Sequence, residues 1–128
     1  MLEKYTFLGA LIDISGDNDL SEAVDINGYR VVGVAMPAAW TTADIAFQVD
    51  PGDGTFRKVY DNEATLVKID APAASGIYLL ANMETANQSG VDPCITGAKV
   101  KVHSIDASDE TDEAQAADRQ LYLLCVAL

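Results

Sequence analysis

Apolar and polar residues alternate with a period of two along much of the chain, which is the spacing of half-buried β-strands. Residues 44–50 and 99–103 have this pattern. The first of them leads into Pro51-Gly52-Asp53-Gly54, a strong hairpin signal because Asp-Gly adopts the positive φ angles of a tight turn. Residues 29–36 and 120–128 are almost uninterrupted apolar runs, which predict central strands covered on both faces.

The pattern as a whole predicts an all-β protein, a jelly-roll-like antiparallel β-sandwich of about eight or nine short strands. Residues 38–40 and 113–117 have the composition of single helical turns, and neither is long enough to organise a core. We find no internal repeat or linker, so residues 1–128 are expected to form a single domain. The expected strands are residues 20–26, 29–36, 44–50, 55–60, 65–69, 77–80, 99–103 and 120–128.

Composition and charge narrow the functional classes. A chain of 128 residues with 49% hydrophobic residues can bury a self-sufficient core. Eight Lys and Arg against 20 Asp and Glu give a net charge of −12, which disfavours binding to nucleic acid or to an anionic membrane. Residues 1–5 lack the basic flank of a signal peptide, so we expect synthesis and folding in a cytosol.

The two cysteines do not form a disulfide framework. Cys94 lies in a turn-rich stretch, and Cys125 lies inside the last apolar run. We expect two reduced thiols with Cys125 in the core, although a bridge between them stays open. The sequence has no CxxC motif, so no structural zinc is expected.

Candidate catalytic chemistry is sparse. His103 is the only histidine, and its register with Lys99 and Lys101 predicts an exposed strand residue. No Gly-x-Ser-x-Gly motif accompanies it, so we expect no enzyme and no cofactor. Asp17-Asn18-Asp19 resembles the start of a calcium loop but lacks the rest of an EF-hand, and we interpret the acids of residues 106–113 as a solvated loop.

Two long loops and one aromatic side chain are the candidate contact surfaces. Residues 82–97 are rich in Asn, Ser and Gly, and residues 106–118 carry the acidic cluster. Long loops on small sandwiches are usually functional or mobile. Trp40 lies in a connection, where it either packs at the edge of the core or contacts a sugar or protein. The candidate partner contacts are Trp40, Asn82, Asn87, Asp109 and Asp112.

The order of segments resembles small virion structural proteins of tailed bacteriophages. The resemblance lies in residues 20–34 and 36–50, together with Asp53-Gly54-Thr55-Phe56 and Val59-Tyr60. It continues in residues 99–104 and 115–121, which are similar to the end of the family's pattern. The acidic stretch 105–113 departs from the pattern and looks like an expanded loop. The resemblance implies a jelly-roll-like sandwich that decorates the particle without a cofactor, on the head or on the tail.

We therefore expect a non-enzymatic virion protein, most simply a capsid decoration or cement protein. Its partners would be the major capsid protein or other virion subunits, and it would form a homo-oligomer, with a trimer as the expected state. An alternative is a receptor- or glycan-binding module of a tail fibre or baseplate that uses Trp40 and the loop of residues 82–97. A third hypothesis is a calcium-stabilised adhesive domain.

Overall fold

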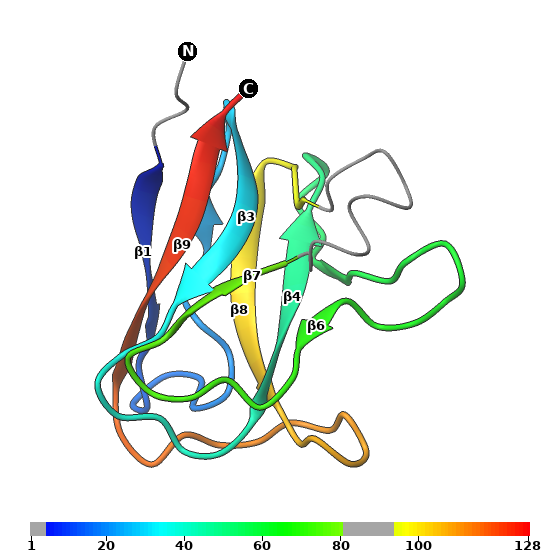
Figure 1. Ribbon diagram of the computed structural model, residues 1–128. Coiled ribbons are helices and arrows are strands. Elements are labelled where there is room, and N and C mark those ends of the chain that lie inside the picture. The colour runs from blue at the N-terminus through cyan, green and yellow to red at the C-terminus, as the bar shows by residue number, and fades with distance from the viewer. Residues whose placement is uncertain (1–4, 81–93) are drawn as a thin grey trace.

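The computed structural model describes residues 5–80 and 94–128, and every paired strand in it is antiparallel (Figure 1). The described residues contain no helix, so the all-β prediction is confirmed. The strands are β1 (Thr6–Ile12), β2 (Val24–Asp25), β3 (Tyr29–Ala35), β4 (Asp44–Asp50), β5 (Arg57–Lys58), β6 (Lys68–Ile69), β7 (Ile77–Leu79), β8 (Lys99–Ile105) and β9 (Arg119–Ala127).

The strands form two sheets that pack as a sandwich. One is four-stranded, in the order β1-β9-β3-β7. The other is five-stranded, in the order β2-β8-β4-β5, with β6 also paired to β4. Figure 1 shows β9 between β1 and β3 in one layer, with β8 beside β4 in the other. The pairs are nested along the chain: β1 with β9, β2 with β8, β3 with β7, and β4 with β5 and β6.

The core lies between the two sheets. Alternate residues of each long strand point inward, as the pleat requires. Phe47 and Leu123 are fully buried in this layer, and burying one such side chain stabilises the fold by roughly 1.5–3 kcal/mol. The buried cluster is Ala10, Ile12, Ile26, Val31, Val34, Met36, Ile45, Phe47, Ile69, Ile95, Val100, Val102, Leu121, Leu123 and Cys125.

The hairpin and the central strands agree with the prediction. Gln48 pairs with Lys58 across the predicted turn, and Gly52 and Gly54 have φ angles of 130° and 83°. The Asp50 carboxylate accepts hydrogen bonds from both glycine N–H groups, at 2.7 and 3.0 Å. The two apolar runs are central strands, β3 between β9 and β7 and β9 between β1 and β3. Their outer faces, however, are not fully covered.

Two local predictions were wrong. β1 was not among the expected strands, although it pairs with β9 along its whole length. Neither residues 38–40 nor residues 113–117 form a helical turn. The second of these segments is extended because its backbone and Gln115 side chain hydrogen-bond to other parts of the chain, as described below.

The outer face of the five-stranded sheet is partly covered by the segment that contains β6. Leu66 of this segment packs with Ala46 and Ile105 in a second, smaller buried cluster. The Asp44 carboxylate, also buried, lies 3.0 Å from Lys68 Nζ and accepts a 2.7 Å hydrogen bond from the Ala71 N–H. The hydrogen bond to Asp44 raises the pKa of Lys68. This cover explains why β4 is buried on both faces at its start rather than alternating.

A glycine in β3 provides a test of the sheet packing. A Cβ at Gly33 would lie 2.5 Å from the carbonyl oxygen of Tyr78 on β7, so the two strands would have to separate. We expect Gly33→Ala to lower the free energy of unfolding by about 1–3 kcal/mol, measured by urea denaturation. Gly16→Ala is the control, because its Cβ would lie 3.6 Å from the nearest atom, the Asp13 oxygen, and the change should stay within about 0.5 kcal/mol. Equal effects of the two variants would contradict the close β3–β7 contact.

Candidate functional site

Loops from distant parts of the chain meet at one end of the sandwich, and the buried side chain of Gln115 joins them. Its Oε1 accepts hydrogen bonds from the Thr41 N–H at 2.9 Å and from Arg119 Nε at 3.1 Å. Its Nε2 donates to the Thr41 carbonyl and to Ser104 Oγ, both at 3.0 Å. The Gln115 N–H donates to the Asn18 carbonyl at 2.8 Å. Every hydrogen-bonding position of this amide is therefore used, and the loops before β2, before β4 and after β8 are held together.

His103 lies at this end, and its predicted exposure was wrong. The register was right, since His103 shares the outer face of β8 with Lys99 and Lys101. Its side chain is nevertheless only 4% exposed, because two chain segments run along the same edge of β8. Leu20 forms a bridge with His103 itself, and Asp112 forms one with Ile105. The segments of Leu20 and Asp112 thus cover this edge of β8 next to the imidazole.

Two carboxylates converge on the imidazole. His103 Nε2 lies 2.8 Å from Asp112 Oδ1 and 3.2 Å from Asp19 Oδ2. The Asp19 side chain is 14% exposed and that of Asp112 is 73% exposed, so the cluster opens to solvent on the Asp112 side. One atom from each of the three residues lies within 4.8 Å of the others. A nitrogen and two carboxylate oxygens at this spacing are a potential set of metal ligands.

Negative charge exceeds positive charge in the cluster. Burial raises the pKa of Asp19, and the neighbouring carboxylates of Asp112 and Asp17 raise it further, whereas the charge of His103 and the hydrogen bond from its ring lower it. The ionised form of Asp19 is therefore disfavoured relative to an exposed aspartate. An imidazolium would balance one of the two carboxylates, and a divalent cation would balance both.

The candidate contact residues fall into separate places. Trp40 is half-buried, packs against the core and donates its Nε1–H to the Ala43 carbonyl at 3.2 Å. Asp109 and Asp112 lie at the same end of the sandwich as Trp40, because Gln115 joins the two loops. Asn82 and Asn87 lie outside the described residues. The described end of their loop reaches the opposite end of β4, where the Ala98 N–H donates to the Asp50 carbonyl. Trp40 and residues 94–97 therefore do not share a surface.

The other acids of the loop after β8 organise the loop itself. Asp106 Oδ1 accepts hydrogen bonds from the N–H and hydroxyl of Ser108, and these bonds lower its pKa. Asp109 Oδ1 likewise accepts from the N–H and hydroxyl of Thr111. Local bonds of this kind are typical of turn-forming aspartates. Of the acids in residues 106–113, Asp112 is the one that reaches a metal-ligating neighbour within the described part of the chain.

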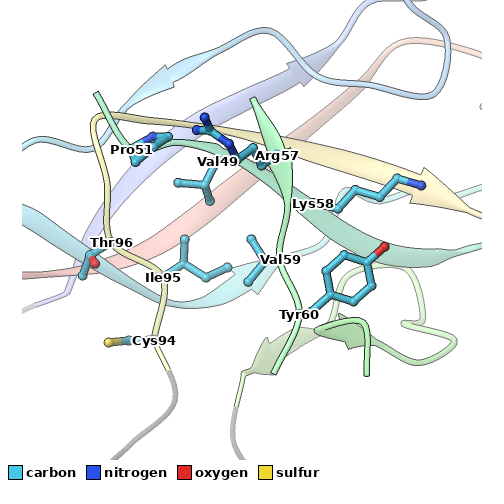
Figure 2. Close-up of a pocket in the computed structure, with 9 residues that line it drawn as sticks. All are labelled: Val49, Pro51, Arg57, Lys58, Val59, Tyr60, Cys94, Ile95 and Thr96. Carbon is cyan, nitrogen blue, oxygen red and sulfur yellow. The ribbon is translucent and has the colours of Figure 1, made fainter. Parts of the chain in front are cut away.

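A shallow cavity of about 390 Å³ lies at the far end, beside β5. Figure 2 shows Val49, Val59 and Ile95 in it, with the Lys58 ammonium pointing away from them. Among the described residues, no hydrogen bond pairs a nucleophile with a base in this cavity. The lining residues are Val49, Pro51, Arg57, Lys58, Val59, Tyr60, Cys94, Ile95 and Thr96.

The outer face of the four-stranded sheet is apolar. Phe7, Ile77, Leu79 and Tyr122 point outward from it and are about half exposed. No acidic residue stands at an outward position of these four strands, although the chain has 20 acids. The outward positions of the strands are Phe7, Gly9, Leu11, Arg30, Val32, Gly33, Ala35, Ile77, Leu79, Gln120, Tyr122, Leu124 and Val126. We refer to this set as the outer sheet face. Leu124 and Val126 of this set are buried, and the exposed apolar side chains around them make the face a candidate interaction surface.

Both cysteines are free thiols, as expected. Cys94 is exposed, and Cys125 belongs to the buried cluster between the sheets. Burial raises the pKa of the Cys125 thiol to about 11, so at neutral pH it is protonated and unreactive. The thiols therefore do not contribute a nucleophile to the site around His103.

Comparison of the chain with family models, with curated proteins and with solved structures gives no match. Among the described residues, no helix has the length and apolar character needed to cross a bilayer.

Gln115 provides a test of the loop cluster. Gln115→Ala leaves the Thr41 backbone groups and the Ser104 hydroxyl without their partner, so we expect a loss of about 2–4 kcal/mol in the free energy of unfolding. Urea denaturation measures it. Gln120→Ala is the control, because Gln120 is exposed and its side chain donates a hydrogen bond to the neighbouring Leu121 carbonyl. A loss at Gln115 no larger than at Gln120 would show that the amide does not hold the loops.

Proposed function

We propose that the chain is a non-enzymatic structural protein of a tailed-phage particle, most simply a capsid decoration or cement protein. Its partners are the major capsid protein or other virion subunits, and it is located in the virion. The observation that carries the proposal is the outer sheet face, a largely apolar surface without acidic residues on a chain of net charge −12. The resemblance of residues 20–60 to small virion proteins supports the same function.

The strand order supports a jelly-roll form of the sandwich. The first strand pairs with the last, the second with the eighth and the third with the seventh, so the chain resembles one long antiparallel ribbon that is rolled up. The further pairs β3 with β9 and β4 with β8 join the turns of the roll into two sheets. Jelly rolls are common in viral capsid proteins and also in lectins.

Self-association is the role we assign to the outer sheet face. Twelve units of net negative charge oppose the approach of copies, and the repulsion acts over about 8 Å at physiological salt. A face without acids is where two copies come together with the least repulsion and the largest loss of exposed apolar surface. Three copies that turn this face toward a common axis would cover it on every copy, as closed oligomers do.

The glycan-binding alternative has less support. A sugar platform would need an exposed aromatic side chain, and Trp40 packs against the core and uses its N–H internally. The described part of the second loop lies at the other end of β4. Binding of a glycan array that is lost in Trp40→Ala would favour this alternative over the decoration protein.

The oligomeric state tests the role of the outer sheet face. We expect light scattering after size exclusion to give three times the chain mass for the wild type and a single chain, 13.6 kDa, for Tyr122→Glu. The new carboxylate would be buried without a partner in the contact. Tyr60→Glu makes the same change at a tyrosine of similar exposure, 54% against 46%, outside this face, and should remain a trimer. A monomeric wild type would contradict the proposal.

Quantitative mass spectrometry of purified phage particles tests the virion role. A decoration protein follows the symmetry of the capsid, so we expect on the order of tens to hundreds of copies per particle, as repeated closed oligomers require. A few copies would indicate a tail module instead. Absence of the chain from particles that carry its gene would refute a virion role altogether.

A further inference from the structure

The cluster of His103, Asp19 and Asp112 has the geometry of a metal centre. Ligand bonds of about 2.0–2.2 Å to a tetrahedral zinc ion place neighbouring ligand atoms about 3.3–3.5 Å apart. The two distances from His103 Nε2, 2.8 and 3.2 Å, are slightly shorter, and the two carboxylates lie within 4.8 Å of each other. The Asp112 side chain is 73% exposed and so has room to adjust to an ion.

The fold holds the backbone of all three ligand residues in place. His103 is part of β8 and is buried, and the Asp19 carbonyl accepts a 2.7 Å hydrogen bond from the Ser104 N–H. Asp112 is fixed through its backbone, because the Glu113 N–H donates to the Ser104 carbonyl at 3.0 Å. All three residues are therefore attached to the same short stretch of β8, although they lie in different parts of the sequence. Preorganisation of this kind is what a metal site needs.

The charges also favour a cation. Two carboxylates face one imidazole nitrogen, which carries at most one proton and so donates at most one hydrogen bond at a time. Asp17 adds further negative charge near Asp19, and the one positive contribution to Asp19 comes from His103. No lysine or arginine forms an ion pair with this pair of carboxylates in the described structure.

We propose that His103, Asp19 and Asp112 bind one zinc ion, with water in the fourth position on the exposed Asp112 side. Zinc fits better than calcium, because calcium takes six to eight oxygen ligands at longer distances and this site has one nitrogen and two oxygens. The ion would clamp the loop before β2 and the loop after β8 onto the edge of β8. Its role is structural, and it does not depend on the virion function.

Zinc titration of the full-length chain tests the proposal, with protein that has been stripped by a chelator and dialysed. We expect calorimetry and elemental analysis to give one zinc ion per chain, and thermal unfolding to shift upward on the order of 10 °C at about 100 times Kd. Asp112→Asn should weaken binding by at least about tenfold, because it removes an anionic ligand. This variant should fold, since Asp112 is mostly exposed.

Asp109→Asn is the matched control. It removes the same charge from the same loop, but Asp109 bonds to Thr111 rather than to His103, so zinc binding should be unchanged. Replacement of zinc by cobalt(II) should give the visible absorption of a four-coordinate site in the wild type and in Asp109→Asn. The proposal is overturned if the wild type retains no zinc, if Asp112→Asn binds zinc as tightly as the wild type, or if calcium is bound in preference to zinc.

Discussion

The antiparallel pairing of β1 with β9 is the constraint on which the rest of the structure depends. It joins the two ends of the chain, from Thr6 opposite Cys125 to Ile12 opposite Arg119. With these ends fixed, β2 pairs with β8 and β3 with β7 inside them. The connections then collect at the two ends of the sandwich. Asp19 and Asp112 consequently meet at His103, although neither is close to the other in the sequence.

Local signals predicted the parts of the fold that are determined locally. The alternation of residues 44–50 and 99–103, the Asp53-Gly54 turn and the two apolar runs all correspond to observed strands or to the observed hairpin. β1 was missed because its run from Thr6 to Ile12 alternates poorly, and its partner lies at the other end of the chain. A local pattern contains neither the pairing of the strands nor their order in the sheets.

The site around His103 could be predicted only in part. Period two placed the imidazole on the correct face of β8, but its burial depends on where the segments of Asp19 and Asp112 run. Gln115 was missed for the same reason, since its partners are Thr41, Ser104 and Arg119. A polar residue within an alanine-rich stretch is a weak signal. Its meaning comes from long-range hydrogen bonds that no spacing rule encodes.

Repulsion between negative charges acts differently at the outer sheet face and in the His103 cluster. Repulsion between copies of an acidic chain is screened by salt beyond about 8 Å, and the outer sheet face, which is the proposed contact, carries no acid. The carboxylates of Asp19 and Asp112 lie well within that distance, and Asp19 is only 14% exposed, so salt in the solvent screens their repulsion less. The proposed zinc ion would balance this charge at the site itself. Screening by solvent would then act between molecules, whereas a bound cation would act inside the cluster.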